Sequence, residues 1–346
     1  MPTIQKVDAA IHEVPLRHAF VTARDQLARQ VSRPVIITLG LNDGSEAVGE
    51  AVPVAYVTGE TPESVLAVVQ STRPLLLGAD VSRLQPILHS LRATVPANPT
   101  AVAGIEMALY SAHAATCGQS LWKLFGGCVR EVETDVTLSI VADAPDRALE
   151  AAEKGFTRFK VKVGGADIEE DYQRLLAIHR AVPSGRFRVD ANQAFTPDAA
   201  LRFIDRALAA GVPLELVEQP TPKEDLAALD AVAAASPVPI FADESVKSPA
   251  DALRIVTETR AQGINVKVMK SGISGALDII AIARAAGCKL MIGCMLEKRR
   301  GIACSLALAC GTGAFDFVDL DSHLLLDEPG ENPYFTQAGP RMLIPE

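Results

Sequence analysis

The sequence predicts a (β/α)8 barrel of the TIM type with an N-terminal α+β capping domain, and three observations lead to this prediction. From about residue 133, short β-rich runs alternate with alanine-rich amphipathic segments. The ends of successive runs lie 24 to 28 residues apart, which fits one strand, one helix and their loops. No dinucleotide-binding G-x-G-x-x-G follows any run, so a closed barrel is favoured over an open doubly wound sheet.

The capping domain is predicted to span residues 1–125. Strand-like runs cover 3–16, 34–41 and 46–50. Asn42-Asp43-Gly44 lies between two of these runs and predicts a hairpin turn. Helical patterns follow, one beginning at Thr61-Pro62, where threonine caps the helix and proline takes its first position, and another from Val102 to Ala115. A meander of strands followed by helices therefore precedes the barrel.

The barrel is predicted to span residues 126–325. Thr196-Pro197 and Ser248-Pro249 predict the starts of two of its helices. The segment from Tyr334 to Ile344 has the pattern of a strand, and we expect it to return to the first domain, which would then comprise 1–125 and 326–346. The eight predicted strands are Val136 to Val141, Arg158 to Val163, Phe187 to Asp190, Leu214 to Glu218, Pro239 to Asp243, Ile264 to Val268, Leu290 to Gly293 and Phe317 to Asp321.

The composition limits the kind of partner that the protein can have. The chain has 346 residues and a formal net charge of -9, from 33 lysines and arginines against 42 acidic residues. A nucleic-acid or membrane binder usually has a basic face, so we expect neither partner. The six cysteines form no C-x-x-C pair, and no apolar run reaches the length of a membrane span. We expect a cytoplasmic homo-oligomer that binds a small molecule.

Three predicted strands end in carboxylates, namely Asp190, Glu218 and Asp243. Active sites of such barrels lie at the carboxyl ends of the strands, so these side chains are expected to converge. Three converging anions repel one another strongly unless they are protonated or bridged by a cation. Ligation by oxygen alone is typical of Mg²⁺, with Mn²⁺ as a second possibility. The alternative is that the three are unrelated surface acids.

Lysines flank this predicted metal site. Lys160 and Lys162 share one face of the second strand, because side chains alternate along a strand, and Lys267 ends the sixth strand. Two opposed lysines beside a metal ion suit removal of a proton next to a carboxylate and its return from the other side, through an enediolate. A lysine base must lose its proton first, and we expect Lys160 and the nearby Mg²⁺ together to lower the pKa of Lys162 by charge repulsion. For Lys160 and Lys162 a buried ion pair with a carboxylate is the alternative.

The residues quoted above make the chain similar to the muconate-lactonizing-enzyme subgroup of the enolase superfamily. This resemblance covers nearly the whole chain, including Val57 to Glu60 and Leu121 to Gly127 in the first domain. It implies that Asp190, Glu218 and Asp243 bind Mg²⁺ and that Lys162 and Lys267 are the acid/base pair. The motifs that carry it are Lys160-Val161-Lys162, Asp190-Ala191-Asn192, Glu218-Gln219-Pro220, Asp243-Glu244-Ser245 and the run from Asn265 to Lys270.

The eighth strand distinguishes the reactions within that subgroup. Asp319-Leu320-Asp321 resembles the D-x-D signature of dipeptide epimerases of the L-Ala-D/L-Glu type, in which the two carboxylates hold the α-ammonium group of the substrate. Two anions favour a zwitterionic dipeptide over an N-acylated amino acid or a dicarboxylate. The sequence therefore predicts epimerisation at the α-carbon of the C-terminal residue of a dipeptide. The alternatives are an N-acylamino-acid racemase, a cycloisomerase, and a ligand-binding barrel without activity.

Three further residues are expected to contact the substrate. Thr137 on the first strand could line the mouth of the barrel, although ordinary packing explains a strand hydroxyl equally well. Lys298, if it reaches the mouth, would favour an acidic side chain on the dipeptide. Arg24 lies in the stretch 18–30, which corresponds to a capping loop over the substrate, where Arg29 competes for the same role. Solvated surface charge is the alternative for Arg24.

Overall fold

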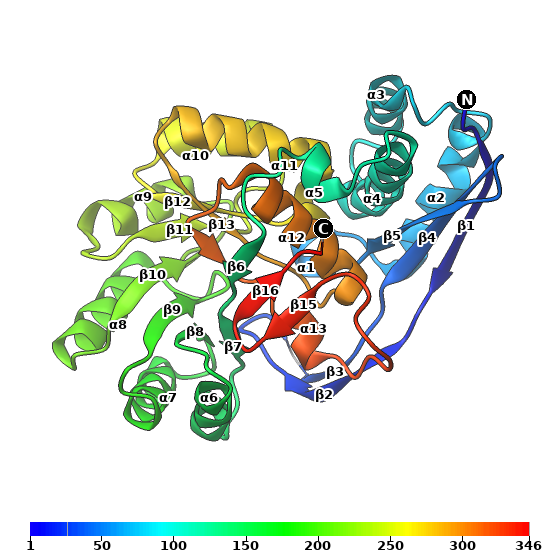
Figure 1. Ribbon diagram of the computed structural model, residues 1–346. Coiled ribbons are helices and arrows are strands. Elements are labelled where there is room, and N and C mark those ends of the chain that lie inside the picture. The colour runs from blue at the N-terminus through cyan, green and yellow to red at the C-terminus, as the bar shows by residue number, and fades with distance from the viewer. Residues whose placement is uncertain (26, 346) are drawn as a thin grey trace.

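The computed structural model describes residues 1–25 and 27–345 and confirms the predicted barrel with its capping domain (Figure 1). Gln26 of the predicted capping loop and Glu346 of the predicted C-terminal return lie outside the described residues. Eight parallel strands pair in chain order. They are β7 Val136–Leu138, β8 Arg158–Lys162, β9 Arg186–Asp190, β10 Leu214–Glu218, β11 Ile240–Ala242, β12 Gly263–Val266, β13 Lys289–Ile292 and β14 Phe317–Val318.

The first and last of these strands are brought together just outside the regular ladder. The backbone N–H of Asp135 donates to the carbonyl of Val318 at 3.2 Å, and the N–H of Leu320 donates to the side chain of Thr134 at 2.8 Å. These contacts join the segment before β7 to the end of β14, which closes the barrel. The strand interiors are buried on both faces, as a parallel sheet covered by helices requires.

One helix follows each strand, and all but the last of these helices cover the outside of the barrel (Figure 1). The last one is short and packs against the capping domain at the mouth of the barrel. The predicted caps are confirmed, because the side chains of Thr196 and Ser248 accept hydrogen bonds from the N–H groups of Ala199 and Asp251 at the starts of their helices. The helices are α6 Ala144–Glu153, α7 Ile168–Ala181, α8 Pro197–Ala209, α9 Leu226–Ala235, α10 Pro249–Glu258, α11 Val268–Ala285, α12 Arg299–Thr312 and α13 Ser322–Leu325.

The capping domain combines an antiparallel sheet, a two-stranded ribbon and helices. The sheet contains β1 Ile4–Ile11, β4 Val35–Leu41 and β5 Glu46–Ala51, and the predicted hairpin joins β4 to β5. The ribbon contains β2 Val14–Phe20 and β3 Arg29–Ser32. The helices are α1 Ala55–Thr58, α2 Pro62–Leu76, α3 Leu84–Thr94, α4 Pro99–Thr116 and α5 Leu121–Leu124.

Helix α4 joins the two parts of the molecule. Almost its whole length is buried, because it packs between the capping sheet and α11. On the sheet side, Gly49 allows a close approach: a Cβ at that position would lie 1.9 Å from the carbonyl oxygen of Gly104. On the barrel side, the buried Glu106 accepts hydrogen bonds from Arg92 and from the N–H of Ser274. The cap is thereby fixed to the barrel by both packing and polar contacts.

The C-terminal segment differs from its predicted position. Its strands, β15 Thr336–Ala338 and β16 Arg341–Leu343, pair with β6 Glu131–Glu133 just before the barrel, rather than with the capping sheet. Only the start of the segment reaches the capping domain, where Leu326 forms an isolated bridge with Leu16. The sequence pattern predicted one strand from Tyr334 to Ile344, whereas the structure forms two short strands there, and a pattern does not identify a strand's partner.

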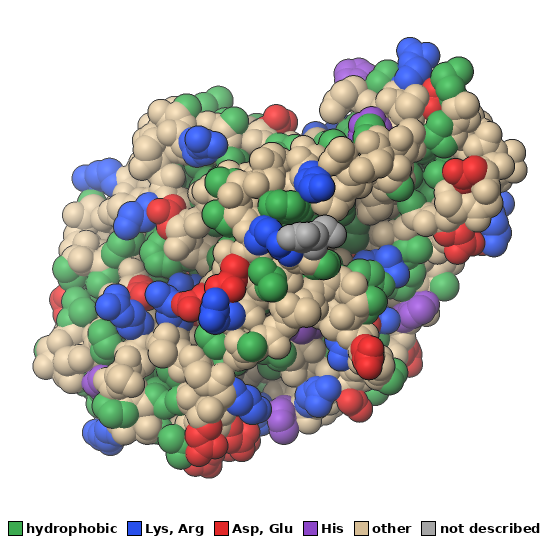
Figure 2. All heavy atoms as spheres, in the orientation of Figure 1, with side chains coloured by type: hydrophobic (Ala, Val, Ile, Leu, Met, Phe, Trp, Pro, Cys, Tyr) green, Lys and Arg blue, Asp and Glu red, His purple; other side chains and the backbone are tan. Residues whose placement is uncertain are grey.

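Two observations bear on the predicted absence of nucleic-acid and membrane partners. Acidic and basic side chains are intermixed on the face shown in Figure 2, and no broad basic area appears on it. Within residues 1–25 and 27–345, no helix combines the length and the apolar character needed to cross a membrane.

Candidate active site

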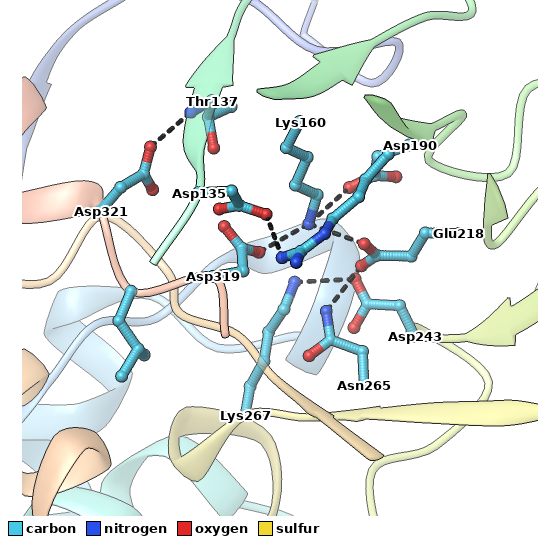
Figure 3. A network of polar contacts seen from close by, with 12 residues as sticks. Asp135, Thr137, Lys160, Asp190, Glu218, Asp243, Asn265, Lys267, Asp319 and Asp321 are labelled. Carbon is cyan, nitrogen blue, oxygen red and sulfur yellow. Dashed lines mark hydrogen bonds and ion pairs between the residues drawn. The ribbon is translucent and has the colours of Figure 1, made fainter. Parts of the chain in front are cut away.

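The carboxyl ends of neighbouring strands bring the predicted acids together (Figure 3). Asp190 and Glu218 are the last residues of β9 and β10, and Asp243 follows β11 directly. Carboxylate oxygens of the three lie within 4.8 Å of one another, and all three side chains are buried. The parallel register explains the convergence, because Asp190 lies opposite Glu218 in the ladder.

The protonation of these acids reflects how crowded they are. Burial, together with the charges of Asp190 and Asp243, raises the pKa of Glu218 to about 8. Burial also opposes ionisation of Asp190, but the ammonium groups of Lys162 and Lys160 outweigh it and lower the pKa of that carboxyl to about 2. Three buried carboxylates within reach of one another form a hard oxygen donor set, so the residues present fit a divalent cation such as Mg²⁺.

Lys162 and Lys267 contact different members of this triad. The Nζ of Lys162, at the end of β8, lies 2.5 Å from Asp190 Oδ2. The Nζ of Lys267, directly after β12, lies 2.7 Å from Asp243 Oδ2. Gly293, directly after β13, makes room for Lys267, since a Cβ there would lie 2.9 Å from its Cε atom. The two ammonium groups therefore reach the triad from separate strands on either side of it.

The expected fall in the pKa of Lys162 depended on Lys160 together with a bound Mg²⁺, and without a cation the carboxylate next to Lys162 dominates. Burial and Lys160 do act to lower that pKa, but the charge of Asp190 outweighs them and raises it. The pKa of Lys267 is raised in the same way, because Asp243 overcomes the effect of burial. Each lysine is the counterion of a carboxylate. A divalent cation held by the same carboxylates would oppose this stabilisation of the ammonium groups.

Lys160 lies deeper in the barrel and connects the triad to the eighth strand (Figure 3). Its Nζ is 2.7 Å from Glu218 Oε2, 3.2 Å from Asp190 Oδ2 and 2.7 Å from Asp319 Oδ2. The side chain is 2% exposed. The predicted alternative for Lys160, a buried ion pair, therefore describes its contacts, and through them it neutralises carboxylates from three strands.

Asp319 and Asp321 follow β14 and are both buried, which excludes simple solvation. Asp321 Oδ2 accepts a hydrogen bond from the backbone N–H of Thr137 at 2.5 Å. Asp321 stands at the start of α13, but its side chain makes no capping hydrogen bond. Burial and the nearby Asp319 raise the pKa of Asp321 to about 6. An additional cationic group beside the two carboxylates would stabilise their charged forms.

A cavity lies between the two lysines and the Asp319–Asp321 pair. Its barrel side presents Lys162, Lys267, Asp319 and Asp321, and Thr137 also lines it. Its other walls include apolar side chains of the capping domain and of the loops after β13 and β14. These are Phe20, Val54, Tyr56, Val57, Met295, Leu296 and Leu325.

Two predicted substrate contacts do not line this cavity. The ammonium group of Lys298 pairs with Glu328 at 3.4 Å. Arg24 donates to the backbone carbonyls of Asn192 at 3.0 Å and Gln193 at 3.2 Å, and so ties its loop to the barrel. The competing candidate, Arg29, does line the cavity. The cause is the same in both cases, because each side chain binds a partner that is distant in the sequence and therefore does not point into the cavity.

Sequence reasoning assigned no role to two residues that support the triad. Lys270 is 1% exposed, and its Nζ donates to Asp243 Oδ1 and to the Asp243 carbonyl, each at 2.5 Å. Asn265 donates through Nδ2 to Glu218 Oε1 at 2.7 Å. A signal was available for Lys270, because it lies one helical turn after Lys267 and residues at that spacing share a helix face.

Comparison with known proteins agrees with this geometry. Residues 4–126 match the family model described as the N-terminal domain of mandelate racemase / muconate lactonizing enzyme, and residues 143–345 match the one described as enolase C-terminal domain-like. The chain is 38% identical to an aromatic dipeptide epimerase from Herpetosiphon aurantiacus over 98% of this chain and 96% of that protein.

Two solved structures are similar over almost the full length. One is a substrate-liganded complex of the L-Ala-D/L-Glu epimerase from Bacillus subtilis, with a TM-score of 0.95, 34% identity, and coverage of 99% of this chain and 96% of that chain. The other is a dipeptide epimerase from Enterococcus faecalis complexed with Mg and the dipeptide L-Leu-L-Tyr, with a TM-score of 0.92, 32% identity, and coverage of 99% and 98%.

Proposed function

Because this chain belongs to the mandelate racemase / muconate lactonizing enzyme family, we propose that it is a Mg²⁺-dependent dipeptide epimerase. The reaction is a 1,1-proton transfer that inverts the α-carbon of the C-terminal residue of a dipeptide. One observation carries the proposal: the cavity that Asp319 and Asp321 line is also lined by Asp243 of the carboxylate triad and by the two lysines on either side of the triad. The names and bound dipeptides of the relatives support it.

The residues of the triad and the two lysines divide the chemistry between them. Asp190, Glu218 and Asp243 would hold Mg²⁺, which when bound would stabilise the negative charge that develops on the substrate carboxylate as the α-proton leaves. Lys162 or Lys267, in its neutral form, takes the α-proton from one face of the substrate. The other lysine, as an ammonium group, delivers a proton to the opposite face. This exchange of roles lets the same site act on both stereoisomers.

Asp319 and Asp321 would hold the α-ammonium group at the other end of the dipeptide. Lys160 fixes Asp319, and the N–H of Thr137 fixes Asp321, so both carboxylates are oriented before the substrate arrives. Charge-assisted hydrogen bonds of this kind are stronger than neutral ones. Because the α-ammonium group and the carboxylate are bound at opposite ends, the reacting carbon is positioned between the lysines.

The two alternatives are not favoured. An N-acylamino-acid racemase or a cycloisomerase would face Asp321 with a group that carries no positive charge, which would leave buried carboxylates uncompensated. A ligand-binding barrel without activity gives no reason for two lysines to flank the triad. Several relatives of the chain are epimerases by name, which also speaks against both.

Exchange of the α-hydrogen in D₂O tests the function directly. Each dipeptide of a small library is incubated with the protein and Mg²⁺, and deuterium incorporation is followed by mass spectrometry. We expect incorporation with free dipeptides, its loss with EDTA, and none with N-succinyl amino acids. Incorporation with N-succinyl amino acids alone would instead support the racemase.

Lysine variants test the two-base mechanism. We expect Lys162→Ala and Lys267→Ala each to abolish epimerisation, while each retains exchange on one stereoisomer, because one base remains. The matched control is Lys154→Ala, which removes an exposed lysine directly after the C-terminal end of α6. Full turnover in either catalytic variant would contradict the mechanism.

A cytoplasmic location and a homo-oligomeric assembly belong to the same proposal. Dipeptides are small, soluble substrates, and no described helix is suited to a membrane. Cell fractionation would test the location. Light scattering coupled to size-exclusion chromatography would test the assembly, and a mass of one chain in solution would refute it.

A further inference from the structure

The cavity wall supplied by the capping domain is almost free of charge. Among the described residues of that wall, Arg29 at the start of β3 carries the one ionic side chain. Its neighbours are apolar or hydroxylic, and they include Phe20, Tyr56 and Val57. The charged groups of the barrel are already matched to the two ends of a dipeptide. The cap wall is therefore left to contact a side chain of the substrate.

The charge of Arg29 is compensated by its own loop. Its Nε donates to Asp25 Oδ1 at 2.7 Å, and its guanidinium carbon lies 5.4 Å from the centre of the Tyr56 ring. Asp25 is itself fixed, because its Oδ2 accepts from both the N–H and the hydroxyl of Thr22 at 2.9 Å. The side chains of Asp25 and Arg29 are only 7% and 24% exposed. The Asp25–Arg29 ion pair is therefore fixed by hydrogen bonds and largely shielded from water.

An ionic pair of this kind presents a different surface from a lone arginine. A lone guanidinium in a partly dry cavity attracts a carboxylate strongly, and a neutralised one does not. What remains is the flat face of the guanidinium beside the ring of Tyr56, with Phe20 in the same wall, and such surfaces favour contact with apolar and aromatic groups. An acidic side chain would have to compete with Asp25 for Arg29 and would also meet the charge of Asp25.

We infer that the Asp25–Arg29 pair sets the side-chain specificity of the site, so that the enzyme prefers dipeptides with apolar or aromatic side chains and discriminates against acidic ones. This inference rests on the proposed function, since it names the substrate class of the same site. It also explains why the arginine in this wall does not select a carboxylate. Removing the charge of Asp25 should expose the charge of Arg29 to the substrate.

The test compares two substrates in four proteins. The value of kcat/KM is measured by exchange in D₂O for L-Ala-L-Phe and L-Ala-L-Glu, with wild type, Asp25→Asn, Arg29→Met and the double variant. Wild type should prefer L-Ala-L-Phe. Asp25→Asn, which keeps the size of the side chain, should shift the ratio toward L-Ala-L-Glu by about tenfold or more, since one uncompensated charge in a partly buried site has at least that effect. The double variant should lose this gain.

Each outcome decides between the possibilities. A wild-type preference for L-Ala-L-Glu, or a ratio unchanged by Asp25→Asn, overturns the specificity inference while exchange on either dipeptide still supports the function. A gain that persists in the double variant also overturns it, because Arg29 would then not be responsible. If no dipeptide exchanges with wild type, the proposed function fails and the inference fails with it. Circular dichroism and thermal melts of the variants verify that each is folded.

Discussion

Replacing Lys160 by methionine should have opposite effects on folding and on metal binding. The Lys160 ammonium group is 2% exposed and contacts Asp190, Glu218 and Asp319 at 2.7 to 3.2 Å. Methionine has a similar length and fills irregular space well, so the change removes the charge with little loss of packing. Three buried carboxylates then lose a shared counterion.

The size of the first effect follows from these contacts. Removing one partner of a buried ion pair costs about 3–5 kcal/mol, because the other partner stays buried and uncompensated. We expect the free energy of unfolding of the metal-free protein to fall by about that amount. The second effect has the other sign. Lys160 competes with a cation for Asp190 and Glu218, and at an effective dielectric constant near 20 one unit charge at such distances supports a change in Mg²⁺ affinity of about tenfold or more. Mg²⁺ should therefore bind Lys160→Met more tightly.

Two measurements distinguish this reasoning from simple damage to the site. Urea unfolding in EDTA gives the stability, and isothermal titration calorimetry gives the Mg²⁺ affinity, with the exposed Lys154→Met as the matched control. A distorted site would lose both stability and affinity. An unchanged free energy of unfolding, or weaker Mg²⁺ binding by Lys160→Met, would refute the assigned role of Lys160 as a shared counterion.

Two predictions concern other parts of the molecule. Burial raises the pKa of Glu297 to about 8, so between pH 4.5 and pH 8 the folded protein retains a proton that the unfolded chain has lost, and stability falls as the pH rises. Glu297→Gln should reduce this fall, and at pH 8 its free energy of unfolding should exceed that of wild type by up to about 4 kcal/mol. Urea unfolding at pH 5 and pH 8 measures this difference, and an equal change in stability between the two pH values in both proteins would contradict the prediction. Gly49→Ala should lower the free energy of unfolding by about 1–3 kcal/mol or more, because the new Cβ would lie 1.9 Å from the carbonyl oxygen of Gly104. The control is Gly40→Ala in the same sheet, whose Cβ would lie 3.1 Å from its nearest neighbour, the Cβ of Lys6, and equal melting temperatures of the two variants would count against the reasoning.

The barrel and its triad could be predicted because both depend on local, repeated signals. Strands of a parallel barrel are buried on both faces and recur at a regular spacing, so their ends can be located from the sequence alone. Once the ends of β9, β10 and β11 are known, Asp190, Glu218 and Asp243 must converge. The direction of Lys160 and Lys162 followed in the same way from the two-residue period of a strand.

The remaining features depend on contacts between distant parts of the chain. Lys298 and Arg24 lie in loops, where no periodicity fixes the direction of a side chain, and each is held by a partner that the sequence does not identify. The direction of the pKa of Lys162 without a bound cation could not be predicted for a related reason. Its lysine neighbour in the motif, Lys160, is visible in the sequence, but the closer carboxylate of Asp190 is a property of the fold.

The charges buried at the carboxyl end of the barrel give a common reason for the metal, the substrate and its side chain. Among the described residues around the triad and the Asp319–Asp321 pair, six buried carboxyl groups face four buried lysines, which gives an excess of two negative charges when all ten groups are ionised, as a bound cation would favour. A divalent cation removes that excess, and a zwitterionic dipeptide with an uncharged side chain leaves the balance unchanged. An N-acylated amino acid or an acidic dipeptide would add a negative charge that no group of the cavity is free to compensate, since Arg29 is already paired. The carboxylates are Asp190, Glu218, Asp243, Glu244, Asp319 and Asp321, and the lysines are Lys160, Lys162, Lys267 and Lys270.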